Sequence, residues 1–353
     1  MNRRFHDDQS RAPEFLRGES GLIQRVRRFL RDHFRGEAPH LVVGYSGGQD
    51  SLALLLVLGE LERLGACRVT AAHVDHGLRP EAAQDAERVV EIGCALGVDV
   101  RVYRPETPLR EQYRGRSVED AARVFRYRTL ASVVSTVNAD AIAVAHHARD
   151  QAETVLLHVL RGSGLAGLSG MAADKVLPVP GSMSGVEMRV IRPFLHESPE
   201  TLVELVERSG LPIIEDPSNT SPDFRRNRIR HALLPLMEDI APGATGRLVS
   251  LADILRADEE ALDDVSHLLL HRTTDDASRL VWDPIQGAPV GLQRRVVRHW
   301  ILQSGFSGDL SRERIEAVVE LTRRNEGGKQ IEIGGGWSVR YAEGRLELRG
   351  RSH

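Results

Sequence analysis

The sequence predicts an α/β protein in which a parallel β-sheet carries helices on both faces, followed by a smaller helical domain with a small β tail. Two observations indicate this class. Between residues 21 and about 215, short β-branched runs alternate with longer segments of helical apolar spacing, which implies right-handed crossovers and parallel pairing. Beyond residue 215 the pattern is mainly helical, and the last residues alternate polar and apolar side chains around glycines.

The expected elements of the first domain follow one another in a regular order. Its first strand, LVVGYS, is apolar and β-branched, as is typical of a strand buried on both faces. Its longest helix begins with Ser117 three residues before Asp120, a spacing typical of a capped N-terminus. The expected helices are 21–34, 50–64, 81–96, 117–137, 150–160 and 201–209, and the expected strands are 41–46, 68–74, 98–104 and 139–147, with two edge strands within 175–193.

The first domain is expected to span residues 21–215 and the second domain residues 216–353, after a flexible tail formed by residues 1–20. In the second domain, a polar loop punctuated by prolines leads into a basic helical segment. The expected helices there cover 225–237, 245–272 and 290–325, and the alternating residues 331–350 are expected to form small antiparallel strands.

Composition narrows the class of protein. The 353 residues carry 47 basic and 50 acidic side chains, a net charge of −3, which excludes a uniformly basic nucleic-acid coat protein. With 41% apolar and 27% charged residues, the chain is typical of a globular protein rather than a disordered one. The two cysteines, Cys67 and Cys94, are too far apart for a Cys-x-x-Cys site. No signal-peptide core or transmembrane run is evident, so a cytoplasmic protein is expected.

The strongest motif is Ser46-Gly47-Gly48-Gln49-Asp50-Ser51, which follows the first strand and opens a helix. Glycines let the backbone approach an anion, and the free N–H groups of the helix start favour phosphate. Ser46 and Ser51 add hydroxyl donors. Asp50 would repel phosphate directly, so its expected role is to hold Mg²⁺ that bridges phosphate oxygens. No Gly-Lys-Ser/Thr follows, which excludes a Walker A loop.

Two further polar clusters follow other strands of the predicted sheet. One contains His73 and Asp75, and the other runs from His146 and His147 to Asp150 and Glu153. Ligands of parallel sheets bind outside the carboxyl ends of the strands, so these clusters are expected to converge with the phosphate loop. Asp150 and Glu153 share one helix face and suit a cationic amine or a metal. Either histidine could contact phosphate or a base, although a single histidine is more often a satisfied core residue.

The phosphate loop resembles the PP-loop of the ATP pyrophosphatase superfamily, whose members cleave ATP between its α- and β-phosphates and share an adenine nucleotide alpha hydrolase-like fold. A narrower set of motifs resembles the tRNA(Ile)-lysidine synthase family over residues 41–237, and Asp150–Met171 is the most specific part. The remaining motifs are HVDHGLR, AARVFRYRTL, IRPF and EDPSNTSPDFRRNRIRHALLPLM. Residues after about 240 have weaker motif support, and the second C-terminal subdomain of longer members is not evident.

This resemblance implies an ATP-dependent ligase that joins L-lysine to C2 of the wobble cytidine of a CAU-anticodon tRNA(Ile). ATP would first adenylate the cytidine O2 and release pyrophosphate, and the lysine ε-amine would then expel AMP, which changes decoding from methionine to isoleucine. Residues 46–51, His73 and Asp75 would bind ATP with Mg²⁺ on Asp50, and Asp150 and Glu153 would receive the amine. His146 and His147 would bind substrate. The positive charge needed near the α-phosphate would come from Arg123 or Arg126 and from Arg226 and Arg230.

The resemblance also implies that residues 216–353 form a tRNA-binding accessory domain, and it makes a homodimer possible. The net charge of residues 321–353 is 7 − 4 = +3, so basic charge is concentrated locally. Candidate tRNA contacts are Arg294, Arg295, Arg298, Arg323 and Arg324, although arginines on helices are often only solvated. Three rivals remain: a tRNA thiolase, which needs cysteines near the site, a two-metal hydrolase and a non-enzymatic RNA-binding protein.

Overall fold

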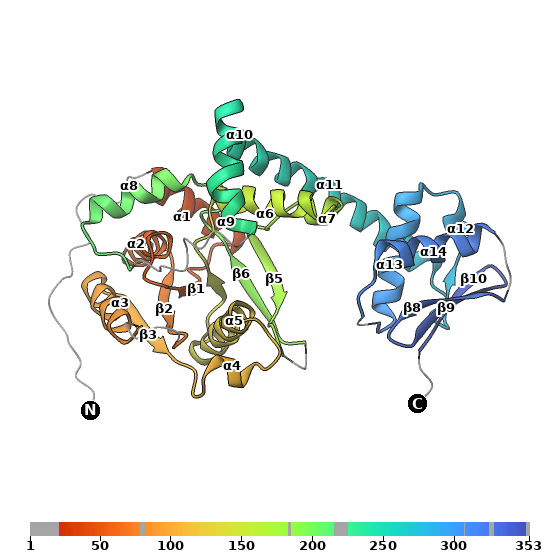
Figure 1. The fold of residues 1–353 in the computed structure, drawn as a ribbon, viewed down its shortest axis with the longest axis horizontal. Coiled ribbons are helices and arrows are strands. Elements are labelled where there is room, and N and C mark those ends of the chain that lie inside the picture. The colour runs from red at the N-terminus through yellow and green to blue at the C-terminus, as the bar shows by residue number, and fades with distance from the viewer. Residues whose placement is uncertain are drawn as a thin grey trace. The chain divides into compact units, whose positions relative to one another are not determined.

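The computed structural model describes residues 21–77, 82–182, 185–214, 225–306, 308–324 and 328–350. The chain divides into two compact units, with the division between Ala252 and Asp253, and each unit is described by itself. The first contains a six-stranded sheet and the second a four-stranded sheet (Figure 1). The domain boundary expected at residue 215 stays a prediction, and the expected flexible tail, residues 1–20, lies outside the described residues.

The first unit has nearly the helices and strands that the sequence pattern predicts. Its helical elements are α1 (Gly21–His33), α2 (Gln49–Arg63), α3 (Ala82–Leu96), α4 (Leu109–Gln112), α5 (Val118–Val137), α6 (Ala148–Leu160), α7 (Leu165–Leu168), α8 (Pro199–Ser209), α9 (Arg225–Arg228), the π-helical turn η3 (Ile229–Leu233) and α10 (Leu234–Ile240). Its strands are β1 (His40–Gly44), β2 (Arg68–Val74), β3 (Asp99–Tyr103), β4 (Ala141–Ala143), β5 (Asp174–Pro178) and β6 (Glu187–Ile191).

The strand order of the first sheet is β3-β2-β1-β4-β6-β5, and only β5 runs antiparallel to its neighbour. The chain moves from β1 outward to β3 and then returns to place β4 on the other side of β1. The order therefore reverses between β1 and β4, the position at which such sheets bind ligands. The predicted parallel α/β sheet is confirmed. The expectation of two edge strands is wrong for β6, which pairs in parallel with β4 and lies inside the sheet, where Val190 and Ile191 are fully buried.

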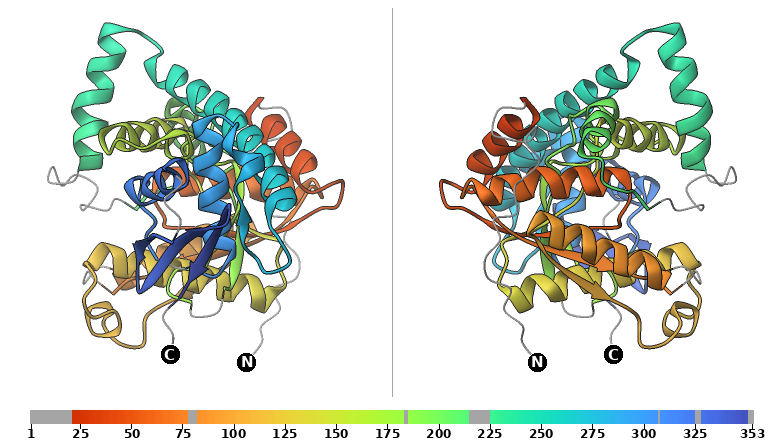
Figure 2. Two further views of the ribbon diagram at one scale, coloured as in Figure 1. Left: turned by 90° about the vertical axis from the view of Figure 1, so that its right-hand side faces the viewer. Right: turned by 90° about the vertical axis from the view of Figure 1, so that its left-hand side faces the viewer.

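Apolar cores lie on both faces of this sheet. Leu41 and Val43 pack against α1, α2, α3 and α8, whereas Val42 packs on the opposite face against α5. The alternation follows from the pleat of a strand that is buried on both faces. Figures 1 and 2 show the helices on both sides of the strands. The two covered faces leave the ends of the strands as the places where polar groups can gather.

The second unit contains most of α11 (Ala244–Thr273) and a small antiparallel sheet of order β7-β10-β9-β8. Buried Trp282 and Trp300 lie in its core. The expected helix over 290–325 is interrupted, because Gly305 takes a left-handed φ of +92° and Ser311 caps a new helix start. The other elements are β7 (Leu280–Val281), α12 (Asp283–Gln286), α13 (Val290–Gln303), α14 (Arg312–Arg323), β8 (Gln330–Gly334), β9 (Trp337–Ala342) and β10 (Arg345–Arg349).

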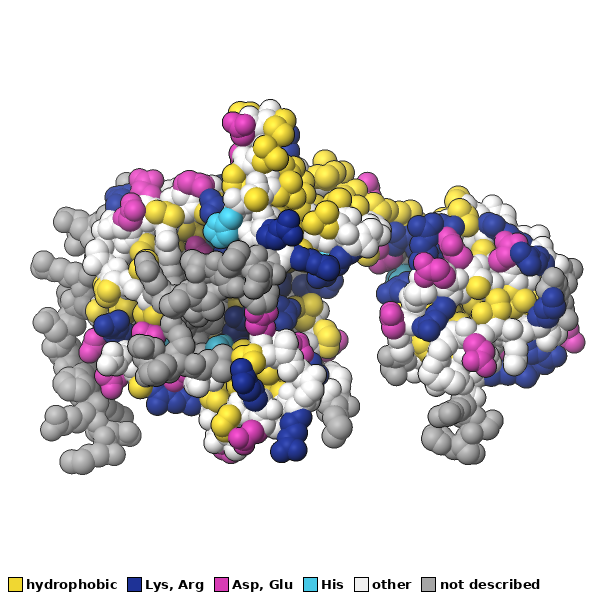
Figure 3. Space-filling view, viewed as in Figure 1, with side chains coloured by type: hydrophobic (Ala, Val, Ile, Leu, Met, Phe, Trp, Pro, Cys, Tyr) yellow, Lys and Arg dark blue, Asp and Glu magenta, His cyan; other side chains and the backbone are white. Residues whose placement is uncertain are grey.

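Exposed hydrophobic side chains gather over α10 and α11 (Figure 3). They include Leu236 and Ile240 on α10 and Leu251 on α11. A small apolar core joins α6, η3 and α10, and these three exposed side chains are not part of it. In the described part of the chain, no helix is long and apolar enough to cross a membrane.

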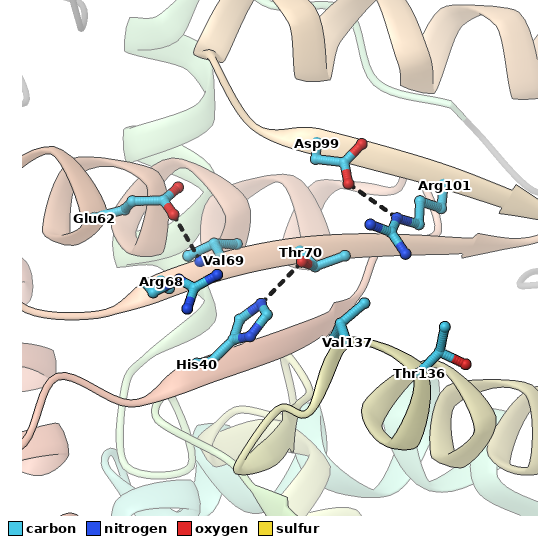
Figure 4. Close-up of a pocket in the computed structure, with 9 residues that line it drawn as sticks. All are labelled: His40, Glu62, Arg68, Val69, Thr70, Asp99, Arg101, Thr136 and Val137. Carbon is cyan, nitrogen blue, oxygen red and sulfur yellow. Dashed lines mark hydrogen bonds and ion pairs between the residues drawn. The ribbon is translucent and has the colours of Figure 1, made fainter.

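A pocket of about 380 Å³ lies at the amino ends of β1, β2 and β3 (Figure 4). Its polar side chains form hydrogen bonds mainly with neighbouring protein groups. His40 Nε2 lies 3.0 Å from Thr70 Oγ1, and Arg101 donates to Asp99. The carboxylate of Glu62 accepts the N–H of Val69. This end of the sheet is opposite the expected site, and its polar side chains are largely satisfied without a ligand.

Gly93 tests the packing of α3 on the sheet. A Cβ at this position would lie 2.0 Å from Val100 Cγ2, so we expect Gly93→Ala to lower the free energy of unfolding by about 1–3 kcal/mol. The control is Gly59→Ala on α2, where the Cβ would meet Val98 Cγ2 at an ordinary 3.4 Å. Urea unfolding followed by circular dichroism measures both variants. Equal midpoints for the two would contradict the packing described here.

Candidate active site

The loop after β1 forms an anion cradle at the start of α2. Gly48 is the N-cap of α2 and offers no side chain to the first helical N–H groups, which stay free to bind an anion. Ser51 Oγ donates to the carbonyl of Gly48 at 2.9 Å and lies 3.0 Å from Ser46 Oγ. The hydroxyls thus brace the loop, and together with the partly exposed Gln49 they surround the helix start.

Gly47 fixes the shape of this cradle. Its φ is +86°, and a Cβ there would lie 2.6 Å from Ile214 Cδ1. The Ile214 N–H donates to the Gly47 carbonyl at 3.0 Å, which ties the loop to the segment after α8. At Gly48 the nearest atom to a Cβ would be Ser46 Oγ at 3.5 Å, and φ is −73°. Only the first glycine is therefore required by the local fold, whereas Gly48 keeps the cradle open for a ligand.

Asp50 lies in the first turn of α2 with its side chain 48% exposed. Among the described residues, no group of three or more His, Cys, Asp or Glu side chains could hold a metal ion. A Mg²⁺ ion commonly uses one or two carboxylates and completes its octahedron with phosphate oxygens and water. The single exposed carboxylate beside the cradle fits that kind of site, which needs a bound phosphate to be complete.

His73 and Asp75, at the end of β2, are both buried, and His73 contacts the residue that precedes the cradle. His73 Nδ1 lies 3.0 Å from the carbonyl oxygen of Tyr45, and burial lowers the pKa of His73. Asp75 accepts the Gly77 N–H at 2.8 Å and pairs with Arg104 at 2.7 Å. Both residues are thus held by protein groups, while Leu78 and Arg79 of the same motif lie outside the described residues.

His147 links the two ends of the candidate site. His147 is the N-cap of α6, and its Nδ1 accepts a hydrogen bond from the backbone N–H of Arg149, so Nε2 carries the ring proton. The backbone N–H of His147 donates to the carboxylate of Asp150. Nε2 lies 3.6 Å from a carboxylate oxygen of Asp50 and 3.6 Å from one of Asp150. Burial opposes a charge on His147, but the hydrogen bond to Asp50 and the charge of Asp150 outweigh it and raise the pKa of His147. The phosphate loop and α6 therefore meet at this imidazole.

Asp150 and Glu153 on α6 are bound by two arginines from the segment α9–η3. Arg226 contacts Asp150 at 2.9 Å and Glu153 at 2.6 Å, and Arg230 contacts Glu153 at 2.5 Å and Asp150 at 3.2 Å. The Glu153 side chain is completely buried under these groups. Burial alone would raise the pKa of Asp150, but the charges of His147 and Arg226 hold it below its usual range. The expected carboxylate pair exists and forms a closed network of four charges.

A π-helical turn presents the second of these arginines. Arg230 lies in η3, and Pro235, which has no N–H, follows at the start of α10. Proline cannot continue the helical hydrogen-bond ladder, and the wider π turn accommodates this loss. Arg225 and Arg228, which the motif does not require, are exposed on α9, and no ion pair is recorded for them in the described ranges.

His146 lies beside this network with a buried Nδ1 that has no hydrogen-bond partner among the described residues. Burial lowers the pKa of His146 to about 4, helped by the charges of Arg192, Arg226 and Arg126. Both Arg123 and Arg126 lie over the Tyr127 ring, 5.2 and 5.4 Å from its centroid, and of the two it is the charge of Arg126 that acts on His146. The imidazole of His146 is neutral and keeps an unused nitrogen.

Two supporting residues were missed by sequence reasoning. Arg192 in the IRPF motif is only 7% exposed and donates to the Ala172 carbonyl at 2.7 Å. Gln151, fully buried on α6, donates to the carbonyl of Met171 at 3.0 Å and accepts its N–H at 2.8 Å. Gln151 holds the end of the glycine-rich segment 162–173 against α6, and Arg192 holds it next to the end of β6. Only their places inside the quoted motifs could have drawn attention to them.

The arginines expected to contact tRNA in the second unit are mostly paired with acids. Arg294 and Arg295 lie within 3 Å of Glu316 and Asp263, respectively, and Arg324 lies 3.1 Å from Glu320. Arg323 lies 3.8 Å from Glu320, and Arg298 is exposed. A phosphate would have to compete with these carboxylates, so their role in RNA binding stays a prediction.

Comparisons with known proteins identify the families that this chain resembles. The chain matches the model of a PP-loop domain over residues 19–237 and that of a TilS substrate binding domain over residues 280–347. A tRNA(Ile)-lysidine synthase of Geobacter sulfurreducens is 34% identical over 86% of this chain, and the chain spans only 63% of that relative. A tRNA(Ile)-lysidine synthase of Streptomyces coelicolor is 35% identical, with 88% of this chain and 86% of the relative covered.

A solved structure supports the fold. The U34-tRNA thiolase of Methanococcus maripaludis superposes with a TM-score of 0.53 at 18% identity, covering 67% of this chain and 80% of the thiolase. At this identity the likeness concerns the arrangement of strands and helices alone.

The buried, neutral His146 makes a pH-dependent prediction. Its pKa is about 4 in the folded protein and near 6.5 when exposed, so the unfolded chain binds a proton first as the pH falls. Stability is therefore lost between about pH 6.5 and 4, by on the order of 3 kcal/mol if this group acts alone. We expect His146→Asn to remove most of this loss, measured as urea midpoints across that range. His231→Asn, an exposed control on η3, should retain it.

Proposed function

This chain belongs to the tRNA(Ile)-lysidine synthase family, and we propose on that premise that it ligates L-lysine to C2 of the wobble cytidine of a CAU-anticodon tRNA(Ile), using ATP and releasing AMP and pyrophosphate. One observation carries the proposal. His147 lies 3.6 Å from both Asp50 and Asp150, so the anion cradle and the carboxylate pair form one site at the β1–β4 reversal. A ligase that joins a phosphate-activated base to an amine needs these two parts side by side.

The first half of the reaction uses the cradle. The phosphates of ATP would lie on residues 46–51, at the positive end of the α2 dipole, with Gln49 at the rim. The cytidine O2 attacks the α-phosphorus, and the bond to the bridging oxygen breaks, so pyrophosphate leaves. A Mg²⁺ ion on Asp50 would neutralise phosphate charge. His73 keeps the loop in place through the Tyr45 carbonyl, Asp75 would face the nucleotide from the end of β2, and Arg126 would stabilise charge at the α-phosphate.

The second half uses α6. The lysine ε-amine attacks C2 of the adenylated cytidine, the C2–O bond breaks and AMP leaves with its electron pair. Asp150 and Glu153 would hold the incoming ammonium and accept its proton. His147 is already engaged with both aspartates, and the nitrogen of His146 that has no partner is buried, so which of the two histidines contacts the base stays a prediction. The target base must leave its stack to reach these groups.

The other reaction classes have less support. Cys67 is buried and donates to the Leu58 carbonyl, and Cys94 lies on α3, so neither cysteine is at the carboxyl ends of the strands where a thiolase would need it. A two-metal hydrolase needs clustered ligands, and the described residues contain no such group of three. Within the proposal, the second unit contacts the tRNA, and the homodimer and the cytoplasmic location stay predictions.

Asp50 tests the ATP half of the site. We expect Asp50→Ala to reduce lysine incorporation at least ~10³-fold, because a preorganised charge at a phosphoryl-transfer site is worth several kcal/mol. The assay mixes the protein with ATP, Mg²⁺, radiolabelled L-lysine and unmodified CAU-anticodon tRNA, and counts label in the tRNA. The side chain is half exposed, so the melting temperature should be unchanged.

The matched control is Glu37→Ala, at an exposed carboxylate before β1, which should keep full incorporation. Normal incorporation by Asp50→Ala would remove that residue from the mechanism. No label in tRNA with the unaltered protein would overturn the proposed function as a whole.

A further inference from the structure

The carboxylates that are proposed to receive lysine are not accessible to it in this structure. The Glu153 side chain has no exposed surface, and that of Asp150 is 11% exposed. The guanidinium groups that cover them, on Arg226 and Arg230, are 41% and 30% exposed. Both arginines therefore lie between the carboxylates and solvent, and an ammonium group can reach Glu153 only after a guanidinium has moved.

The charges of this network are balanced. Two carboxylates face two guanidinium groups, and each arginine contacts both acids at 2.5–3.2 Å. A lysine ammonium added to this arrangement would introduce an uncompensated positive charge at a buried position, which is strongly unfavourable. Binding of the amine thus requires a new partner for at least one arginine.

The phosphate cradle provides a place for that partner. Asp50 in the cradle and Asp150 in the network both lie 3.6 Å from the same His147 Nε2. The charge of Asp50 is also among those that act on Arg230. Polyphosphate bound at the start of α2 would therefore lie in the field of Arg230, and Arg226 is joined to the same region through Asp150. Guanidinium groups bind phosphate oxygens in two-pronged geometry.

We propose that Arg226 and Arg230 block the amine site until a nucleotide binds, and that they then exchange the carboxylates of α6 for its phosphates. This inference rests on the proposed function and adds to it an order of binding, with the nucleotide before lysine. The arginines then have two successive roles: they keep Asp150 and Glu153 neutralised in the free protein, and they stabilise phosphate charge in the loaded one.

The position of the arginines in the chain suits such an exchange. Both are on the short α9–η3 segment rather than on the sheet, and their side chains are long and partly exposed. The acids, in contrast, lie on α6, whose start is fixed by the reciprocal cap between His147 and Asp150. The carboxylates are thus the fixed half of the network, and the guanidinium groups are the half that can change partners.

Isothermal titration of L-lysine tests this order. The full chain is titrated alone and after saturation with Mg²⁺ and α,β-methylene-ATP, which cannot be cleaved between the α- and β-phosphates. We expect the Kd for lysine to be at least tenfold lower with the nucleotide, and by linkage the nucleotide Kd to fall by the same factor with lysine present. Equal lysine Kd values, or no lysine binding in either state, would overturn the exchange.

Substitutions of the two arginines distinguish the proposed exchange of partners from a purely structural role of their ion pairs. In Arg230→Gln and Arg226→Gln, lysine should bind without nucleotide at least fivefold more tightly than it binds the unaltered free protein, and the nucleotide effect should fall below threefold. Arg225→Gln and Arg228→Gln, exposed on the same segment, should keep the full nucleotide effect. If the former variants melt early, the titrations of the unaltered protein still decide the proposal. Lysine incorporation into tRNA with equal Kd values would reject the exchange and leave the proposed function standing.

Discussion

The reversal of strand order between β1 and β4 is the constraint on which the site depends. It places the starts of α2 and α6 next to each other, so two positive helix ends face one region. The two ends are used differently. The α2 start has a glycine N-cap and leaves its N–H groups for a ligand, whereas the α6 start is closed by His147 and Asp150. One helix end is thus left open for an anion, and the other presents carboxylates.

Much of this architecture could be predicted from the sequence, because it is encoded locally. The β-branched runs, the helical spacing and the Gly47-Gly48 turn each report on a few neighbouring residues, and the structure confirms the α/β sheet that they imply. The predictions that were wrong concern which strands pair and where a helix is interrupted. The position of β6 inside the sheet depends on its contact with β4, and the break before α14 depends on Gly305 and Ser311, which a broad helical pattern conceals.

The contacts of the site could not be predicted, because they join residues far apart in the chain. Sequence spacing placed Asp150 beside Glu153 but gave no sign that Arg226 and Arg230, more than 70 positions later, would bind both. Nor did it show that His147 would reach Asp50, or that Arg126 would act on His146. These contacts depend on how the helices pack against one another. A sequence motif contains the residues of the site but does not show which of them are in contact.

The contact between Gly47 and Ile214 has an evolutionary consequence. Because the backbone of Gly47 touches the Ile214 side chain and accepts its N–H, the two positions cannot drift independently. A bulkier replacement at 214 must fit beside a loop that has no room for a Cβ at position 47. Because the φ of +86° already restricts position 47 to glycine, the constraint falls on position 214, which lies 167 positions later in the chain, and homologues should keep a side chain there that fits against the loop.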